Sequence, residues 1–282
     1  MAYTCFDVDV TDGVAHVVLN RADELNTMNA DFWRELPEIA RSLSQSGEAR
    51  VMVLSSTGKH FTAGMDLSVF TGESSLLGGG STKVELGRQR SQIRLSAALL
   101  QESFTALERA RMPVLAAIQG GCVGGGVDMV CACDCRYATR DAFFVIQETN
   151  LGMTADVGTL QRLPKLIPAG VVRELAYTGR RMSAQRAKDV GLVNEVFPSH
   201  EAMLAGVLEI AAEIADKSPL AIWGSKQMLN YARDHSVEDG LEYVATWQAG
   251  MFFGGDMAEA FRAKAEKRKP VFQNNPRTRR SV

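Results

Sequence analysis

The chain has 282 residues, a net charge of −2 at pH 7 and 46% hydrophobic residues. A chain of this length can bury a full core, as one large domain or as one domain with an appendage. The charge gives no sign of a nucleic-acid-binding protein, and no apolar run approaches the ~20 residues of a membrane helix.

The two ends of the chain carry no recognisable targeting signal. Residues 1–10 lack both the apolar core of a signal peptide and the Arg/Ser-rich pattern of a transit peptide, and Arg279–Val282 is not a peroxisomal tripeptide. We therefore expect a cytoplasmic protein.

Four of the five cysteines crowd together, at Cys122, Cys131, Cys133 and Cys135. Their alternate spacing is not the C-x-x-C knuckle of a zinc site, and histidine is scarce. We expect free thiols that act as small buried hydrophobic side chains, and no metal.

The first third of the chain predicts a hairpin, a helix and a buried strand. Alternating apolar residues in Phe6–Val10 and Val14–Leu19 flank an Asp-Gly turn, which is typical of a hairpin. Apolar residues at helical spacing predict an amphipathic helix over Asn29–Ser44, and Val51–Leu54 predicts a short buried strand.

Two loops and a long helix follow. Gly58–Leu67 is a small-residue loop that would offer backbone N–H groups, and we expect His60 within it to be solvated rather than a base. Thr71–Lys83 is rich in glycine and serine and predicts a mobile surface loop. Arg90–Arg111 predicts a long helix. Its expected apolar contacts are Ile93, Leu95, Leu99, Leu100, Phe104 and Leu107.

The central stretch is a glycine cluster, residues 120–128, between a predicted buried strand at Pro113–Ile118 and a predicted helix at Val127–Cys133. Three consecutive glycines before a helix leave N–H groups uncovered at the positive end of the helix dipole, where a negative oxygen can be stabilised. A dinucleotide fingerprint fits this spacing badly. A cluster that serves only tight turns and packing stays open as the alternative.

Three carboxylates follow the glycines among mostly apolar neighbours: Asp128, Glu148 and Asp156. A predicted strand at Phe143–Ile146 leads to Glu148. An anion-stabilising backbone beside carboxylates suits proton transfer next to a carbonyl. The alternatives are a solvated Glu148 at the strand end and an Asp156 that caps a short helix beginning near Val157.

The composition of the chain changes in its last third. Ser183 is expected to cap a helix, Gly191 to end one, and Leu192–Val196 to form a strand. The pattern is wholly helical after Pro198, which predicts a core at 1–198 and a helical region at 199–282. The expected helices are His200–Lys217, Leu220–Arg233, Val237–Phe252 and Met257–Lys267.

Four segments together resemble the enoyl-CoA hydratase/isomerase, or crotonase, superfamily, in the family's order and over residues 5 to 270. They are HFTAGMDL (60–67), AAIQGGCVGGGVDMVCACDCRYAT (116–139), FFVIQETNLGMTADVGTLQRLPKLI (143–167) and YTGRRMSAQRAKDVGLVNEVFP (177–198). Within the superfamily, the chain most resembles the 3,5-2,4-dienoyl-CoA isomerases, which carry Asp, Glu and Asp at the positions of Asp128, Glu148 and Asp156. Hydratases usually have Glu at the first position and Gly at the third.

The resemblance implies an α/β fold: a crotonase-like ββα spiral core with a helical C-terminal region that assembles trimers, usually paired into hexamers. It also implies an acyl-CoA substrate whose thioester oxygen lies between the backbone N–H groups of Met65 and Gly125. No metal or redox cofactor is implied, since coenzyme A belongs to the substrate. The implied substrate-binding residues are Ala63, Gly64, Met65, Asp66, Leu67 and Gly125.

The implied reaction, a step of fatty-acid β-oxidation, takes a proton from carbon 2 of a 3,5-dienoyl-CoA and returns one to carbon 6. We expect Glu148 to act at carbon 2 and Asp156 at carbon 6, with Asp128 orienting or tuning them. An enoyl-CoA hydratase, a 3-enoyl to 2-enoyl-CoA isomerase and a non-catalytic acyl-CoA-binding protein stay as alternatives. The presence of all three acids argues against the last.

Overall fold

The computed structural model describes residues 3–66, 69, 85–252 and 254–278. The strands are β1 Phe6–Thr11, β2 Val14–Leu19, β3 Val51–Ser56, β4 Val114–Ile118, β5 Gly121–Val123, β6 Cys135–Thr139, β7 Phe143–Val145, β8 Met182–Ser183 and β9 Glu195–Phe197. The α-helices are α1 Ala30–Ser46, α2 Leu86–Arg109, α3 Gly125–Cys131, α4 Thr159–Arg162, α5 Ala169–Thr178, α6 Ala184–Asp189, α7 His200–Ala215, α8 Pro219–Ala232, α9 Val237–Met251 and α10 Gly255–Ala265. Short 3-10 turns are η1 Ala22–Glu24, η3 Glu148–Leu151 and η4 Leu163–Lys165.

Two sheets organise the chain. The larger has the strand order β1-β2-β3-β4-β6-β9, in which the predicted hairpin β1-β2 is antiparallel and the other neighbours are parallel. The smaller has the order β5-β7-β8. Helices alternate with the parallel strands, which confirms the predicted α/β class.

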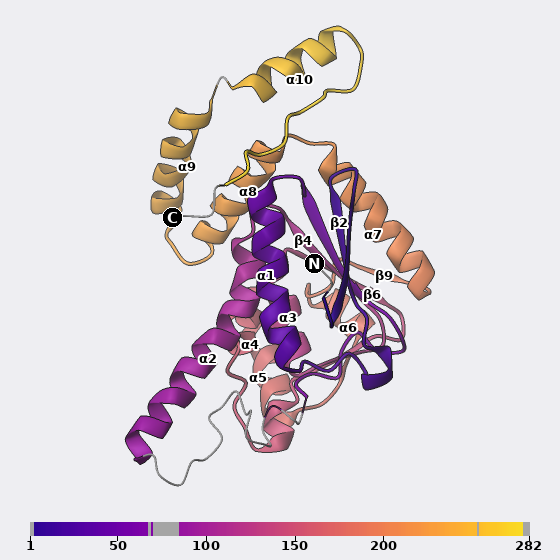
Figure 1. Ribbon diagram of the computed structural model, residues 1–282, viewed down its shortest axis with the longest axis vertical. Helices are drawn as coiled ribbons and strands as arrows, with labels where there is room; N and C mark the ends of the chain where they lie inside the picture. The colour runs from indigo at the N-terminus through magenta and orange to yellow at the C-terminus, as the bar shows by residue number, and fades with distance from the viewer. Residues whose placement is uncertain (1–2, 67–68, 70–84, 253, 279–282) are drawn as a thin grey trace.

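The larger sheet is covered on both faces (Figure 1). In β3, Val51 and Val53 pack in one cluster with Met203 of α7, whereas Met52 and Leu54 belong to the main core with α1 and α2. A strand buried on both faces reads as a continuous apolar run instead of an alternating one. This double burial explains why Val51–Leu54 could be recognised as a buried strand.

The four helices expected after residue 198 are confirmed as α7 to α10. They are not alike, because α7 packs on the sheet whereas α9 contains no buried residue. The division of the chain at residue 198 stays a prediction. The strand expected at Leu192–Val196 begins later, as β9, because Leu192 and Val193 are buried in the main core instead.

The apolar side chains in the first half of α2 are not buried as predicted. Ile93, Leu95 and Leu99 were expected to contact the core, but they are 43%, 61% and 73% exposed. In Figure 1 this half of α2 projects beyond the body of the molecule. Only the second half packs inside, through Leu100, Phe104 and Leu107. The loop predicted at Thr71–Lys83 lies outside the described residues.

A buried lysine joins α8 to the core. Nζ of Lys226 donates to the carbonyls of Leu107 and Met112, both at 3.0 Å, and forms an ion pair with Asp134 at 2.8 Å. Replacing Lys226 with Met should lower the free energy of unfolding by about 3–5 kcal/mol, because it leaves a mostly buried carboxylate without its cation. Urea unfolding measures this loss.

The matched control is Lys217→Met, at an exposed lysine that follows α7. Its free energy of unfolding should change by less than about 0.5 kcal/mol. Equal denaturation midpoints for the Lys226 variant and the wild type would contradict the prediction.

Candidate active site

The two small-residue loops are joined by backbone hydrogen bonds. Thr62 forms a parallel bridge with Cys122 of β5: the Thr62 amide donates to the Gly121 carbonyl at 3.0 Å, and the Val123 amide donates to the Thr62 carbonyl at 3.2 Å. The two predicted donors, Met65 and Gly125, each follow their paired residue by three positions. The backbone pairing of the two loops therefore fixes the position of one predicted donor relative to the other.

Both predicted donors have amides directed away from the neighbouring backbone. Met65 bridges Met28 in parallel, and the bonds of that bridge use the Gly64 carbonyl and the Asp66 amide. In such a bridge the amide of the middle residue points to the opposite side. Gly125 is the first residue of α3, where an N–H has no acceptor within its own helix. Both amides are thus placed to serve a ligand.

His60 is half-buried and makes a structural contact that we did not expect. Its Nδ1 accepts a hydrogen bond from the Gly121 amide at 2.8 Å, so the neutral ring carries its proton on Nε2. Burial lowers the pKa of His60, and the charges of Lys59 and Arg181 lower it further. A neutral His60 therefore joins the first loop to the start of β5.

Asp128 is fully buried in the first turn of α3. Its Oδ1 accepts a hydrogen bond of 2.5 Å from the Thr159 amide, whereas its Oδ2 is buried without a partner among the described residues. Burial raises the pKa of Asp128 to about 6, and the charge of Asp156 also raises it. A carboxyl of this kind is partly protonated near neutral pH.

Glu148 follows β7, as expected, and turns back toward the glycine cluster. A Cβ added to Gly124, the residue before α3, would lie 3.2 Å from Glu148 Oε1. The carboxyl therefore lies next to the glycine that precedes the Gly125 amide. Burial, together with the charges of Asp128 and Asp156, raises the pKa of Glu148 to about 7. The solvated strand-end alternative is wrong.

Asp156 is exposed, and its backbone carbonyl accepts a hydrogen bond from Gln101 Nε2 of α2 at 2.7 Å. It does not cap a helix, because the residue that precedes α4 is Gly158. Its charge acts on both Asp128 and Glu148. The charges of the three predicted carboxylates therefore influence one another at the two more buried positions, Asp128 and Glu148.

A cavity of about 750 Å³ opens beside the paired loops. Three of the predicted substrate-binding residues line it: Ala63, Met65 and Asp66. Phe143 and Arg181 also line it, with the Arg181 guanidinium 4.2 Å from the centre of the Phe143 ring. Leu67, which we also expected to bind substrate, lies outside the described residues.

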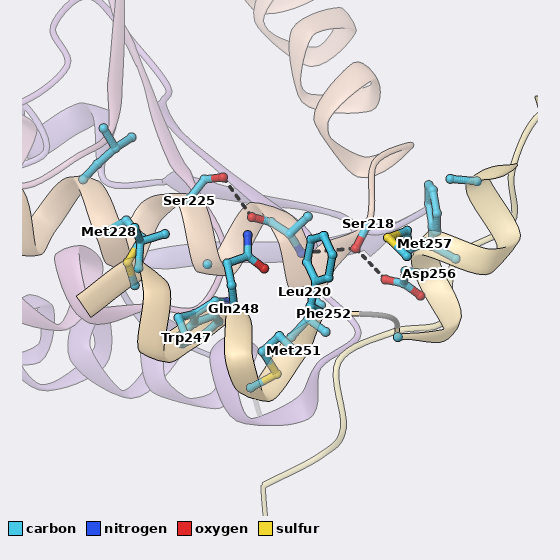
Figure 2. A pocket seen from close by; sticks show the side chains of 17 residues that line it. Ser218, Leu220, Ser225, Met228, Trp247, Gln248, Met251, Phe252, Asp256 and Met257 are labelled. Carbon is cyan, nitrogen blue, oxygen red and sulfur yellow. Dashed lines mark hydrogen bonds between the residues drawn. The ribbon is translucent and has the colours of Figure 1, made fainter. Parts of the chain in front are cut away.

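A second cavity of about 760 Å³ lies among α8, α9 and α10 (Figure 2). It is mostly apolar, with Met228, Trp247 and Met251 on its walls, and its Asp256 accepts a hydrogen bond from Ser218 at 2.5 Å. None of the predicted site residues lines this cavity. The paired loops are therefore the better candidate for the active site.

Three of the four crowded cysteines are buried thiols, as expected, and the fourth, Cys135, is half-buried. Cys122, Cys131 and Cys133 are free and buried. Burial raises the pKa of both Cys131 and Cys133 to about 12, so these side chains are neutral. They serve as small core residues around α3.

Comparison with known proteins decides the family. Residues 9–275 match the enoyl-CoA hydratase/isomerase family. The chain belongs to this family. It is 45% identical to the peroxisomal Delta(3,5)-Delta(2,4)-dienoyl-CoA isomerase of Arabidopsis thaliana, over 92% of each chain. It is 46% identical to the mitochondrial enzyme of that name from Mus musculus, over 90% of this chain and 77% of the relative.

Solved structures of the same family share the fold. An enoyl-CoA hydratase from Bacillus anthracis superposes with a TM-score of 0.84 at 31% identity, over 96% of this chain and all of that chain. A second structure, described as a putative enoyl-CoA hydratase from Streptomyces coelicolor, superposes with a TM-score of 0.85 at 26% identity. The match covers 97% of this chain and 96% of that chain. The crotonase-like core expected of this enoyl-CoA hydratase/isomerase family member is confirmed.

The raised pKa of Asp128 predicts how stability depends on pH. A carboxyl that holds its proton more tightly in the folded state stabilises the fold below its unfolded pKa of 3.8, and this contribution is lost as pH rises through about 6. The unfolding free energy of the wild type should therefore fall between about pH 4 and pH 7, with up to about 3 kcal/mol from Asp128. Asp128→Asn should flatten this fall.

Chemical denaturation at a series of pH values measures the effect. Asn can still accept the Thr159 amide, so the variant changes the charge while it keeps that hydrogen bond. The control is Asp23→Asn, at an exposed carboxylate in η1, which should follow the wild-type curve. Identical pH curves for wild type and Asp128→Asn would show that Asp128 ionises normally.

Proposed function

We propose that this chain is a Delta(3,5)-Delta(2,4)-dienoyl-CoA isomerase of fatty-acid β-oxidation. The observation that carries the proposal is the Glu148 carboxyl beside Gly124, subject to the charges of Asp128 and Asp156, near two backbone amides that are placed to bind a ligand. The dienoyl-CoA isomerases to which the chain is similar support the same reaction.

The two amides would stabilise the charge that develops during the reaction. Removal of a proton from carbon 2 gives a dienolate, whose negative charge spreads onto the thioester oxygen. Hydrogen bonds from the Met65 and Gly125 amides to that oxygen strengthen as the charge grows, so they lower the barrier more than they strengthen substrate binding.

The carboxylates would move the proton. Glu148, next to the amide pair, takes the proton from carbon 2, and Asp156 returns one to carbon 6. Asp128 is fully buried, so we assign it the role of tuning the charge of the other two. With pKa values of about 6 and about 7 for Asp128 and Glu148, one carboxyl of the set can be protonated while another is ionised at neutral pH.

The cavity beside Ala63, Met65 and Asp66 would receive the coenzyme A part of the substrate. Arg181 on its wall offers a planar cation, which suits a phosphate of coenzyme A. The carboxylates are not among the residues that line this cavity. The acyl chain would therefore extend from the cavity past the amide pair toward them.

Ultraviolet absorbance with two substrates tests the proposal. A 3,5-dienoyl-CoA should gain the absorbance band of a conjugated 2,4-dienoyl thioester, and a 2-enoyl-CoA should keep its band. Loss of the 2-enoyl band would indicate a hydratase. No change in either, with binding intact, would indicate a non-catalytic acyl-CoA-binding protein.

We also propose a homotrimer or homohexamer. The helical C-terminal region supports assembly, because α9 contains no buried residue and exposes Val237 and Leu241 at 80% and 63%. Apolar side chains gathered on an exposed helix favour a protein interface. Light scattering after size exclusion measures the mass; a monomer at micromolar concentration would contradict this.

A cytoplasmic location remains part of the proposal. No helix in the described ranges is long and apolar enough to cross a membrane. The relatives are named as peroxisomal and mitochondrial proteins, so fractionation of the source cells is the test.

A further inference from the structure

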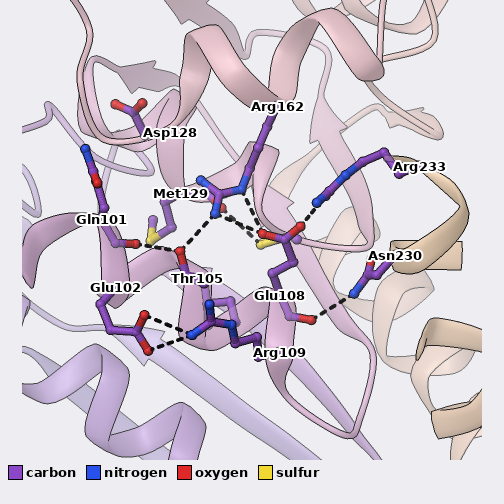
Figure 3. Close-up of polar contacts among 12 residues, drawn as sticks. Gln101, Glu102, Thr105, Glu108, Arg109, Asp128, Met129, Arg162, Asn230 and Arg233 are labelled. Atoms are coloured by element: carbon purple, nitrogen blue, oxygen red, sulfur yellow. Dashed lines mark hydrogen bonds and ion pairs between the residues drawn. The ribbon is translucent and has the colours of Figure 1, made fainter. Parts of the chain in front are cut away.

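One face of α2 contacts the segment of residues 156–162, which begins with Asp156. Gln101, Thr105 and Glu108 are spaced so that they share a helix face. Gln101 binds the Asp156 carbonyl. The Arg162 guanidinium donates to Glu108 Oε2 at 3.0 and 2.9 Å and to Thr105 Oγ1 at 3.0 Å (Figure 3). The segment is therefore attached to α2 near both of its ends.

The same segment carries the amide that orients Asp128. That amide belongs to Thr159, the first residue of α4, and α4 has only four residues. A helix this short does not hold its shape by its own hydrogen bonds. The Arg162 guanidinium lies against Gly158, where an added Cβ would overlap Nη1. Arg162 thus fixes both ends of the turn on which Thr159 lies.

The partner of Arg162 is a stable anion. Burial alone would raise the pKa of Glu108, but Arg233 and Arg162 together lower it below its ordinary value. Both side chains of the Arg162–Glu108 pair are only 13% exposed. Arg233 directly follows α8 and forms a close ion pair with Glu108, so two arginines share one mostly buried carboxylate. Asp234 pairs with Arg233 at 2.9 Å, and Lys165 with Asp234 at 3.5 Å.

Several charged or titratable groups face Asp128. They are the carboxyls of Glu148 and Asp156, the neutral thiols of Cys122 and Cys131, and the guanidinium of Arg162. Arg162 is the cation of this set, and it favours the ionised form of Asp128. Its removal would therefore act on Asp128 both through the Thr159 amide and through charge.

We propose that Arg162 is a positioning residue for the carboxylate set: it holds residues 156–162 against α2 and so keeps the Thr159 amide on Asp128. The kinetic consequence rests on the proposed isomerase reaction. The structural consequence concerns Asp128 and needs no substrate.

Kinetics of Arg162→Met give the first test. We expect kcat for a 3,5-dienoyl-CoA to fall about 10- to 100-fold, because a small displacement of the acid groups slows proton transfer, with KM unchanged within about twofold. The acidic limb of the pH–rate profile should move to higher pH. The matched control is Arg109→Met on α2, whose pairing with Glu102 is exposed; it should behave as wild type (Figure 3).

A cycle of variants without substrate gives the second test. We compare Arg162→Met with its parent in the wild-type background and in the Asp128→Asn background, measuring unfolding free energy at pH 5 and pH 8. If Arg162 acts through Asp128, its loss should cost more at pH 8 than at pH 5, and this difference should shrink in the Asp128→Asn background. Equal costs in both backgrounds would overturn the proposal.

The two tests separate this inference from the proposed function. A wild type that does not isomerise dienoyl-CoA refutes the function, and the cycle then decides the role of Arg162 by itself. If Arg162→Met does not fold, Thr105→Val removes one hydrogen bond to Arg162 without a change of charge. It should lower kcat about two- to tenfold; unchanged kcat and an unchanged pH profile would overturn the proposal.

Discussion

Replacing Glu148 with Gln is expected to lower kcat for a 3,5-dienoyl-CoA by about 10²–10⁴-fold, which is the usual contribution of a general acid or base. Gln has nearly the same shape as Glu, so its side chain can keep the place beside Gly124. It cannot accept the carbon 2 proton. Steady-state kinetics by the 2,4-dienoyl absorbance measure the loss, and calorimetric titration with a CoA ester should show nearly unchanged affinity.

The same variant carries its own control for folding. Because burial raises the pKa of Glu148 to about 7, ionising it costs free energy in the folded state at pH 8. Glu148→Gln should therefore be at least as stable as wild type at that pH. Glu209→Gln, at an exposed position in α7, should leave kcat and stability unchanged. Full activity of Glu148→Gln would refute the role at carbon 2.

Replacing Gly64 with Ala is expected to lower kcat by about 10²–10³-fold, the effect of losing one donor to the oxyanion. Gly64 has a φ of +90°, and an added Cβ would lie 2.7 Å from the Val123 carbonyl oxygen. Backbone must therefore move between the two paired loops. Since Gly64 directly precedes Met65, the Met65 amide moves away from the position that suits the thioester oxygen.

Gly170→Ala is the matched control. Gly170 lies in α5, its φ is not in the left-handed range, and an added Cβ meets nothing within 4 Å. Alanine there should keep kcat and slightly stabilise the helix. A transition-state-like CoA ester that binds Gly64→Ala as tightly as wild type would contradict the expected displacement of the amide.

Local patterns predicted most of the secondary structure because they depend on neighbouring residues. The Asp-Gly hairpin and the Ser183 cap of α6 each involve contacts within a few positions. The glycine cluster could be predicted as a source of uncovered amides, since its chemistry is carried by the backbone. The separate roles of the three carboxylates came from the family resemblance.

The features that the sequence did not predict depend on distant contacts. Leu95 and Leu99 fit a buried helix face, but α2 is longer than the core that it covers. His60 and Arg162 find their partners 61 and 54 residues away along the chain. For Arg162, the matching spacing of Gln101, Thr105 and Glu108 was visible but gave no hint of what would face it.

The bridge between Thr62 and Cys122 separates two tasks that an enzyme must perform. The proposed oxyanion donors are backbone groups whose positions follow from strand pairing, whereas the proposed acid groups are side chains on α3, after β7 and before α4. An exchange of one acid for another residue can therefore change where protons are delivered while the enolate is stabilised as before. A fold built in this way can acquire new proton-transfer reactions by single substitutions of its acid side chains, while the pair of backbone amides stays in place.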